Sequence, residues 1–236
     1  MKRSYDSSKS SFSRVKPNTR GNDSIRIEEA VDIAKFPPNK WRTFRILPCY
    51  FLPIVQYWIE VKTKSDKIVP IPKTATNYDV YEDEFNASIE CPYAKTGAKW
   101  QRAYYLNAID RNMQEDEPRK KSKPTKQESK TGFKEKGSST WTPVVALRVV
   151  SGLMNKIKGF QELNKVINKK TKETEHYYLD DAKYGMDVNI KFVPDAAGTD
   201  KWQIQLGERT PLTEEEMEYL VWDLEGLIPQ IYTETP

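Results

Sequence analysis

A two-residue alternation of apolar and polar side chains recurs along this chain and constrains its fold more than any other feature. In residues 54–61, Val55, Tyr57, Ile59 and Val61 would share an apolar face, with Trp58 on the opposite one. A period of two is typical of β-strands. The same reasoning predicts strands over residues 41–47, 100–110, 187–193 and 201–206, and a central strand over the apolar run 141–150.

Helical patterns are fewer. Apolar residues recur at helical spacing after Ser151, which predicts a serine-capped helix over residues 151–168. Residues 28–35 are expected to form a short helix that ends before two consecutive prolines. Thr213 and Glu216 form a capping box for a helix that runs to about Leu224. Its apolar stripe would consist of Met217, Leu220, Val221 and Leu224.

The order of these elements indicates the fold class. The sequence does not alternate strands with helices, and residues 62–99 contain a hairpin, a proline-bounded edge segment and an irregular insertion. We therefore expect a mainly β (α+β) domain of the small-barrel kind, with an inserted helix and irregular insertions, rather than a doubly wound fold.

Charge divides the chain into parts. The formal net charge is only +4, from 38 Lys and Arg against 34 Asp and Glu, but residues 1–20 and 119–136 are strongly basic, and residues 213–236 contain seven acidic side chains and no Lys or Arg. We expect a flexible basic arm over 1–24, a domain over 25–212 with a mobile basic loop at 111–139, and an acidic C-terminal helix and tail over 213–236.

Motifs for catalysis and metal binding are lacking. The sequence has one histidine, His176, and two cysteines, Cys49 and Cys91, too few for a structural zinc site. It has no phosphate-binding glycine loop, and the pair Asp180-Asp181 is more typical of a turn than of a metal site. We expect a non-enzymatic protein without cofactor or metal. No apolar run approaches the roughly 20 residues that cross a bilayer, so a soluble protein without membrane contact is expected.

Nucleic-acid binding has positive support. A single-strand binder needs cations for phosphates and exposed aromatic faces on which bases stack. Several strands place both kinds of side chain on one face, although a single strand tryptophan is more often a core residue. The candidate single-stranded DNA contacts are Trp41, Arg45, Trp58, Lys62, Trp100, Arg102, Tyr104, Tyr105, Arg111, Lys191 and Trp202.

Short segments in a defined order resemble one family. They are Thr43-Phe-Arg-Ile-Leu-Pro48, Glu90-Cys-Pro-Tyr-Ala94, Tyr104-Tyr-Leu-Asn-Ala-Ile109, Tyr184-Gly-Met-Asp-Val-Asn-Ile-Lys191, Lys201-Trp202 and Pro211-Leu212. With the basic arm and acidic C-terminal part, they cover most of the chain and resemble the phage single-stranded DNA-binding (helix-destabilising) proteins of the T-even type.

The resemblance implies an OB-fold, a five-stranded barrel, that binds single-stranded DNA cooperatively in phage DNA replication, recombination and repair, in the cytoplasm of a bacterial host. Lys2, Arg3 and Ser4 resemble the arm motif through which family members associate along the strand, and residues 119–123 could be a second copy. The acidic terminus would contact replication or recombination proteins. The sequence departs from the family at the zinc ligands, because the segment after Cys91 lacks the second cysteine.

We therefore expect a sequence-independent protein that coats single-stranded DNA. The alternative is a protein-binding adaptor, or a transcription or replication cofactor, that acts through the acidic C-terminal helix. The apolar stripe of that helix would more often pack on its own domain.

Overall fold

A computed structural model describes residues 14–15, 31, 33–63, 66–116, 133–134, 141–168 and 170–228. The strands are β1 (Arg14–Val15), β2 (Trp41–Ile46), β3 (Leu52–Lys62), β4 (Ile68–Thr74), β5 (Tyr78–Asp79), β6 (Glu84–Phe85), β7 (Trp100–Asp110), β8 (Phe133–Lys134), β9 (Trp141–Thr142), β10 (Val144–Val150), β11 (Lys165–Ile167), β12 (Thr174–His176), β13 (Met186–Phe192), β14 (Trp202–Arg209) and β15 (Val221–Trp222). The α-helices are α2 (Arg111–Asp116), α3 (Ser151–Gln161) and α4 (Glu214–Met217), and 3-10 helices span Ala94–Thr96, Gly198–Lys201 and Glu225–Leu227. The expectations for Lys2, Arg3 and Ser4 and for residues 119–123 lie outside the described residues.

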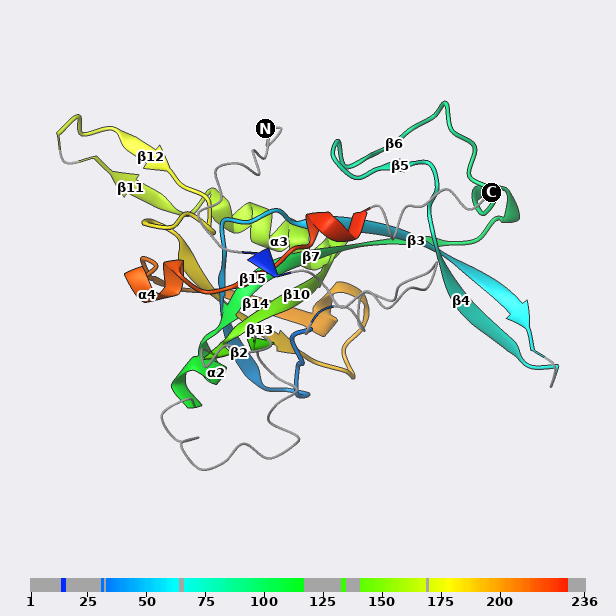
Figure 1. The fold of residues 1–236 in the computed structure, drawn as a ribbon, viewed down its shortest axis with the longest axis horizontal. Helices are drawn as coiled ribbons and strands as arrows, with labels where there is room; N and C mark the ends of the chain where they lie inside the picture. The colour runs from blue at the N-terminus through cyan, green and yellow to red at the C-terminus, as the bar shows by residue number, and fades with distance from the viewer. Residues whose placement is uncertain are drawn as a thin grey trace.

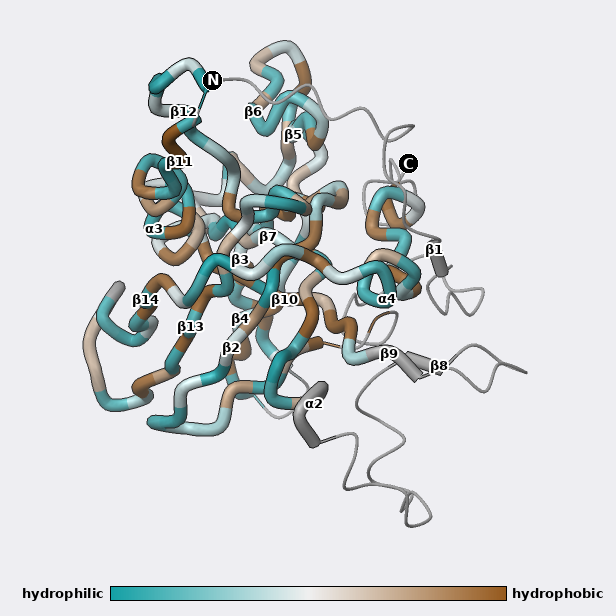
Figure 2. Tube along the Cα trace, turned by 90° about the vertical axis from the view of Figure 1, so that its left-hand side faces the viewer, coloured by the Kyte–Doolittle hydropathy of each residue, from teal (hydrophilic) through white to brown (hydrophobic). Residues whose placement is uncertain are grey.

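The protein is mainly β, with a large antiparallel sheet and few helices, as expected (Figure 1). Seven strands form the main sheet, in which β14, β13, β2 and β7 follow one another side by side (Figure 2). β3 and β4 continue the sheet beyond β7, and β10 also pairs with β7. The sheet is not closed by hydrogen bonds among the described strands, since β14 and β10 are not paired.

The long strand β7 organises the sheet. Its C-terminal end pairs with β2, with Phe44 opposite Asp110, and its N-terminal end pairs with β3, with Tyr57 opposite Trp100. β10 pairs along most of β7, over residues that β2 and β3 also contact. Because a strand has two edges, β2 and β3 must share one edge of β7 while β10 occupies the other.

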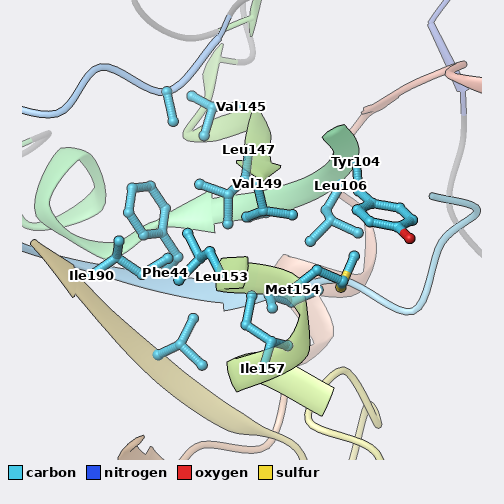
Figure 3. Packing of buried hydrophobic residues seen from close by; sticks show 14 of the residues in the cluster. Phe44, Tyr104, Leu106, Val145, Leu147, Val149, Leu153, Met154, Ile157 and Ile190 are labelled. Atoms are coloured by element: carbon cyan, nitrogen blue, oxygen red, sulfur yellow. The ribbon is translucent and has the colours of Figure 1, made fainter. Parts of the chain in front are cut away.

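Helix α3 covers one face of the sheet. Its buried residues Leu153, Met154 and Ile157 pack on inward side chains of β2, β7, β10 and β13 (Figure 3). The helix contacts β10 and β14, the two strands that remain unpaired with each other. Apolar side chains of α3 thus fill the space that a closed sheet would enclose.

The C-terminal segment packs on the domain as well. Val221 lies in a cluster with Leu47, Ile109 and Val144, and Leu224 and Leu227 pack with Leu52 and Tyr105. All of these side chains are buried. The acidic segment is therefore continuous with the domain through Ile228.

The β3–β4 hairpin extends beyond the rest of the sheet (Figure 1). The Trp58 amide donates to the carbonyl of Lys99, which directly precedes β7. Backbone groups of successive residues in a strand face opposite edges, so those of Tyr57, Ile59 and Val61 face β4. The bonded partners in β4 are then Val69, Ile71 and Lys73, and the backbone nitrogens of Pro70 and Pro72 face the free edge. Proline offers no N–H, so this edge is protected against pairing with another strand.

Most predicted strands are confirmed, but the helices are shorter than the periodicity suggested. α3 ends at Gln161, and Lys165–Ile167 forms β11 instead. Ser151 does not cap the helix; its hydroxyl donates to the Arg102 carbonyl. The capping box of Thr213 and Glu216 is confirmed, yet α4 ends at Met217 because the following residues turn into the core as β15.

Two further expectations differ from the structure. In place of the helix expected over residues 28–35, the described part of that segment is not helical, and Ile33 forms a parallel bridge with Ala146. The expected irregular loop from residue 111 begins with a short helix, α2. None of the described helices is long and apolar enough to cross a membrane.

Candidate nucleic-acid interface

The structure separates the predicted DNA contacts into two groups at opposite ends of β7. Trp100 and Arg102 begin the strand, with Trp58 beside them on β3. Trp41 and Lys191 lie past the other end, where β2 and β13 pair beyond Asp110. At about 3.3 Å per residue, β7 alone spans roughly 33 Å. The two groups therefore lie at separate places on the sheet.

The two tryptophans at the N-terminal end of β7 lie on different faces. Trp100 is directly opposite Tyr57, so the two side chains share a face. Trp58 follows Tyr57 in the strand and points the other way. Trp100 is 50% exposed and Trp58 is 38% exposed, but one run of bases cannot stack on both along a single face.

On the face of Trp100, five aromatic side chains and one arginine from three segments form a contiguous row, which we call the aromatic row: Tyr81, Tyr50, Phe51, Tyr104, Arg102 and Trp100. Ring centroids are 6.5 Å apart for Tyr81 and Tyr50, 6.3 Å for Tyr50 and Phe51, and 5.9 Å for Phe51 and Tyr104. Tyr81 is 66% exposed, and Tyr50 and Phe51 are partly exposed. The row ends in exposed rings at Tyr81 and Trp100.

Tyr104 links this surface to the interior. Its ring belongs to the core cluster and is only 4% exposed, and its hydroxyl points away from the other labelled side chains of that cluster (Figure 3). The ammonium of Lys158, on α3, lies 5.6 Å from the centre of the same ring. A cation from the helix therefore stands beside the row.

Arg102 is the central cation of the row. Its guanidinium lies 5.2 Å from the Tyr78 ring centre and 5.8 Å from that of Trp100. Its polar contacts are long, 3.5 Å to the Tyr104 hydroxyl and 3.5 Å to Asp83, and its Nε is buried without a hydrogen-bond partner in the described part of the chain. Burial alone would lower the pKa of Arg102, but Tyr104, Tyr78 and Asp83 raise it overall, so it stays charged.

A loop carboxylate completes this site. Asp83 accepts hydrogen bonds from the hydroxyls of Tyr78 and Tyr104, the latter at 3.1 Å. Burial, together with the hydrogen bond to Asp83, raises the pKa of Tyr78 well above its usual range. Both hydroxyls therefore stay protonated as donors, and the loop between β5 and β6 is tied to β7.

A second exposed aromatic surface lies at the other end of the sheet. The Lys191 ammonium is 4.8 Å from the Trp41 ring centre, and Trp41 is 38% exposed. An open pocket of about 620 Å³ adjoins it, lined by Trp41, Lys156, Gly159, Phe160, Leu163, Gln203, Ile204 and Gln205. The predicted contact Trp202 is partly buried against Phe36 and Phe192.

The structure does not support Arg45 as a surface contact. Its side chain is fully buried and donates to the carbonyls of Thr210, Ile46, Leu179 and Asp181. Burial lowers the pKa of Arg45, and the carboxylates of Asp187 and Asp180 offset part of that effect. Arg45 is a structural cation that satisfies backbone oxygens of the 179–181 and 210 segments.

Three other candidates are also occupied within the protein. Tyr105 is 3% exposed and packs in the core with Leu224 and Leu227, so it has no face for a base. Arg111 forms ion pairs with Asp187, at 3.3 Å, and with Glu216. Lys62 is exposed but pairs with Asp66 at 3.0 Å, far along the hairpin from Arg102.

Sequence reasoning missed several members of the site: Tyr50, Phe51, Tyr78, Tyr81, Asp83 and Lys158. They come from the connection before β3, the insertion before β7 and helix α3, so no spacing in the sequence relates them. The only local signal was the unusual density of aromatic residues in these irregular segments.

No group of three or more potential metal ligands occurs within the described ranges. Cys91 is buried, and although burial alone would raise its thiol pKa, hydrogen bonds from Thr76, Tyr93 and Ala94 lower it overall. Compared with models of known protein families, the chain matches none. No curated protein sequence matches it either.

Proposed function

We propose that this protein binds single-stranded DNA on the aromatic row, without reading sequence. The observation that carries the proposal is an arginine whose Nε has no hydrogen-bond partner in the described part of the chain, set beside the exposed ring of Trp100. Every base has a π-face, so stacking on Trp100 and Tyr81 is tolerant of sequence. Arg102 and Lys158 would neutralise phosphates, which makes affinity fall with rising salt concentration.

We further propose that the main sheet is an OB-fold barrel. Two features support this: an antiparallel path from β14 through β13, β2 with β3, and β7 to β10, and a helix after β10 that contacts both β10 and β14. In OB-folds the oligonucleotide surface lies by the second and third strands, beside the loop that connects the first strand to the second. Here β7 and the segment 63–99, which carries Tyr81 and Asp83, would be those parts.

The wider role is proposed on the resemblance described above. The protein would be a phage helix-destabilising protein that coats single strands cooperatively during DNA replication, recombination and repair in the bacterial cytoplasm. Lys2, Arg3 and Ser4 would contact neighbouring copies, and the acidic C-terminus would contact replication or recombination proteins.

The adaptor alternative finds less support. The apolar side chains on which it depends, Val221 and Leu224, are 2% and 1% exposed and pack within the domain. The acidic side chains of α4, Glu214 and Glu215, are exposed, but the apolar residue Val221 that follows them packs inside the domain and offers no docking face.

Fluorescence titration with poly-dT at several salt concentrations tests the proposed binding. We expect DNA to quench the tryptophan emission. The logarithm of the binding constant should fall linearly with the logarithm of the salt concentration. A duplex of the same length serves as the control. Absence of quenching, or tighter binding to the duplex, would refute the proposal.

A further inference from the structure

Asp83 gathers hydrogen-bond donors from two parts of the molecule. The Tyr78 hydroxyl donates to one carboxylate oxygen, and the Tyr104 hydroxyl donates to the other at 3.1 Å. Arg102 Nη1 lies 3.5 Å from the same carboxylate. Arg102 and Tyr104 belong to β7, whereas Asp83 belongs to the loop between β5 and β6. A loop acid thus lies against the arginine of the aromatic row.

We infer that Asp83 holds, in the DNA-free protein, the place beside Arg102 that a phosphate of the bound strand takes, so that binding displaces the loop. The inference rests on the proposed function and names how that site is regulated. Carboxylate and phosphate oxygens accept the same guanidinium hydrogen bonds, so the two anions compete for Arg102.

The geometry of the ion pair favours exchange. The distance of 3.5 Å is long for a charge-assisted hydrogen bond, which is typically about 2.7–2.9 Å. Arg102 Nε is also buried and has no hydrogen-bond partner among the residues that the structure describes. Oδ1 of Asp83 lies near Arg102, and the tyrosine hydroxyls occupy both carboxylate oxygens, whereas a phosphodiester can offer both of its charged oxygens to the guanidinium.

The loop itself is suited to movement. Asp83 has a φ of 57°, in the left-handed region that non-glycine residues adopt less readily. Its neighbours Tyr81 and Glu82 are exposed, and their amides donate to the side chain of Asp79 at the end of β5. Displacing Asp83 would break its two tyrosine hydrogen bonds and its contact with Arg102, and it would move Tyr81 relative to β7.

Asp83→Asn tests the competition. Asparagine keeps an oxygen that accepts a hydrogen bond from Tyr104 or Tyr78, but it removes the negative charge that lies beside Arg102. We expect this variant to bind a short oligothymidylate about two- to fivefold more tightly than the wild type. Glu84→Gln is the matched control, because it removes the same charge from the adjacent, exposed residue. It should change affinity by less than half of that effect.

Equal effects of the two variants, or weaker binding by Asp83→Asn, would refute the inference that Asp83 competes with phosphate for Arg102. The proposed function would still stand. If neither the wild type nor Asp83→Asn binds the oligonucleotide, the proposed function fails and this inference fails with it. The two failures are therefore distinguishable in one set of titrations.

Amide hydrogen exchange of the wild-type protein gives a second readout that needs no variant. Binding should accelerate exchange in residues 77–86, where the loop is released, even as residues of β7 become protected. If Asp83 stays in place on binding, hydrogen exchange in residues 77–86 should be unchanged or slower. That result would contradict displacement.

Discussion

The side-chain amide of Asn107 forms two hydrogen bonds with the backbone of Trp222. Its Nδ2 donates to the Trp222 carbonyl at 2.9 Å, and its Oδ1 accepts from the Trp222 amide at 2.9 Å. Asn107 is 2% exposed, so these bonds are shielded from water. A single side chain of β7 thereby fixes the C-terminal segment on the sheet as a strand partner would.

Asn107→Asp should destabilise the fold, because the new carboxylate would face the Trp222 carbonyl without a donor. We expect a loss of about 2–3 kcal/mol in the free energy of unfolding, measured by urea denaturation. The exposed Asn155→Asp is the control and should remain close to wild type. Equal midpoints for both variants would show that the C-terminal segment contributes little to stability.

Trp100→Ala should weaken binding of an oligothymidylate of about eight nucleotides by about 1–3 kcal/mol, because it removes one stacking face from the aromatic row. Trp58→Ala is the matched control, since Trp58 is similarly exposed on the opposite face of the sheet. Fluorescence anisotropy measures both affinities. A larger loss with Trp58→Ala would place the bound strand on the other face.

Arg45→Met should act on stability rather than on binding. The substitution leaves the carbonyls of Leu179 and Thr210 without their donor, and we expect a loss of about 3 kcal/mol in the free energy of unfolding. The folded variant should bind oligothymidylate within about twofold of the wild-type affinity, since mutations away from a contact leave it largely intact. Arg148→Met, at a partly exposed position on β10, controls for the loss of charge. Weak DNA binding by a stable Arg45→Met protein would restore the original surface interpretation.

Deprotonation of the Tyr78 hydroxyl should lower the free energy of unfolding in alkaline solution. Its pKa is raised above the usual 10.0 in the folded protein, first by burial and then by the hydrogen bond to Asp83. The stabilisation is therefore complete below pH 10 and is lost as pH rises above it, with a slope of up to about 1.4 kcal/mol per pH unit. Urea midpoints between pH 9 and about 11.5 should fall less steeply for Tyr78→Phe. Parallel slopes would contradict this assignment.

Pro70 and Pro72 should keep the β3–β4 hairpin from pairing with another chain. The double variant Pro70→Val, Pro72→Val restores two N–H donors on a free edge that carries exposed apolar residues such as Ile68. We expect concentration-dependent self-association in sedimentation velocity experiments without DNA. Pro194→Val, in the β13–β14 connection, is the control. A monomeric double variant would mean that the edge is protected in another way.

Local pattern was sufficient to locate the strands of the main sheet but not the helix ends. Alternation over residues 100–110 predicted β7 with its observed bounds, because a two-residue period is a property of the segment itself. The pattern after Ser151 continued to residue 168, yet α3 ends at Gln161, where Leu163 turns outward and the chain begins the β11–β12 hairpin. Where a helix ends depends on what lies beside it, which the sequence does not state.

The residue types of the candidate site were predictable from the sequence, but their positions in the structure were not. The pairing of tryptophan with arginine at the start of β7 was visible in the residues, and Trp100 and Arg102 do lie together on the surface. Tyr104 and Arg45 looked equally exposed in the strand pattern, but both are buried, because α3 covers one face of the sheet and the 179–181 and 210 segments cover the other.

The sequence by itself determined the mainly β class, the approximate positions of the main-sheet strands and the local concentration of charge, since each of these depends on neighbours in the chain. Tertiary structure alone decided which face of each strand meets water, and it brought Asp83 to Arg102 and Tyr81 to Tyr50 from different segments of the chain. The physical reason is that burial and ion pairing depend on distances in space, which register and loop packing set.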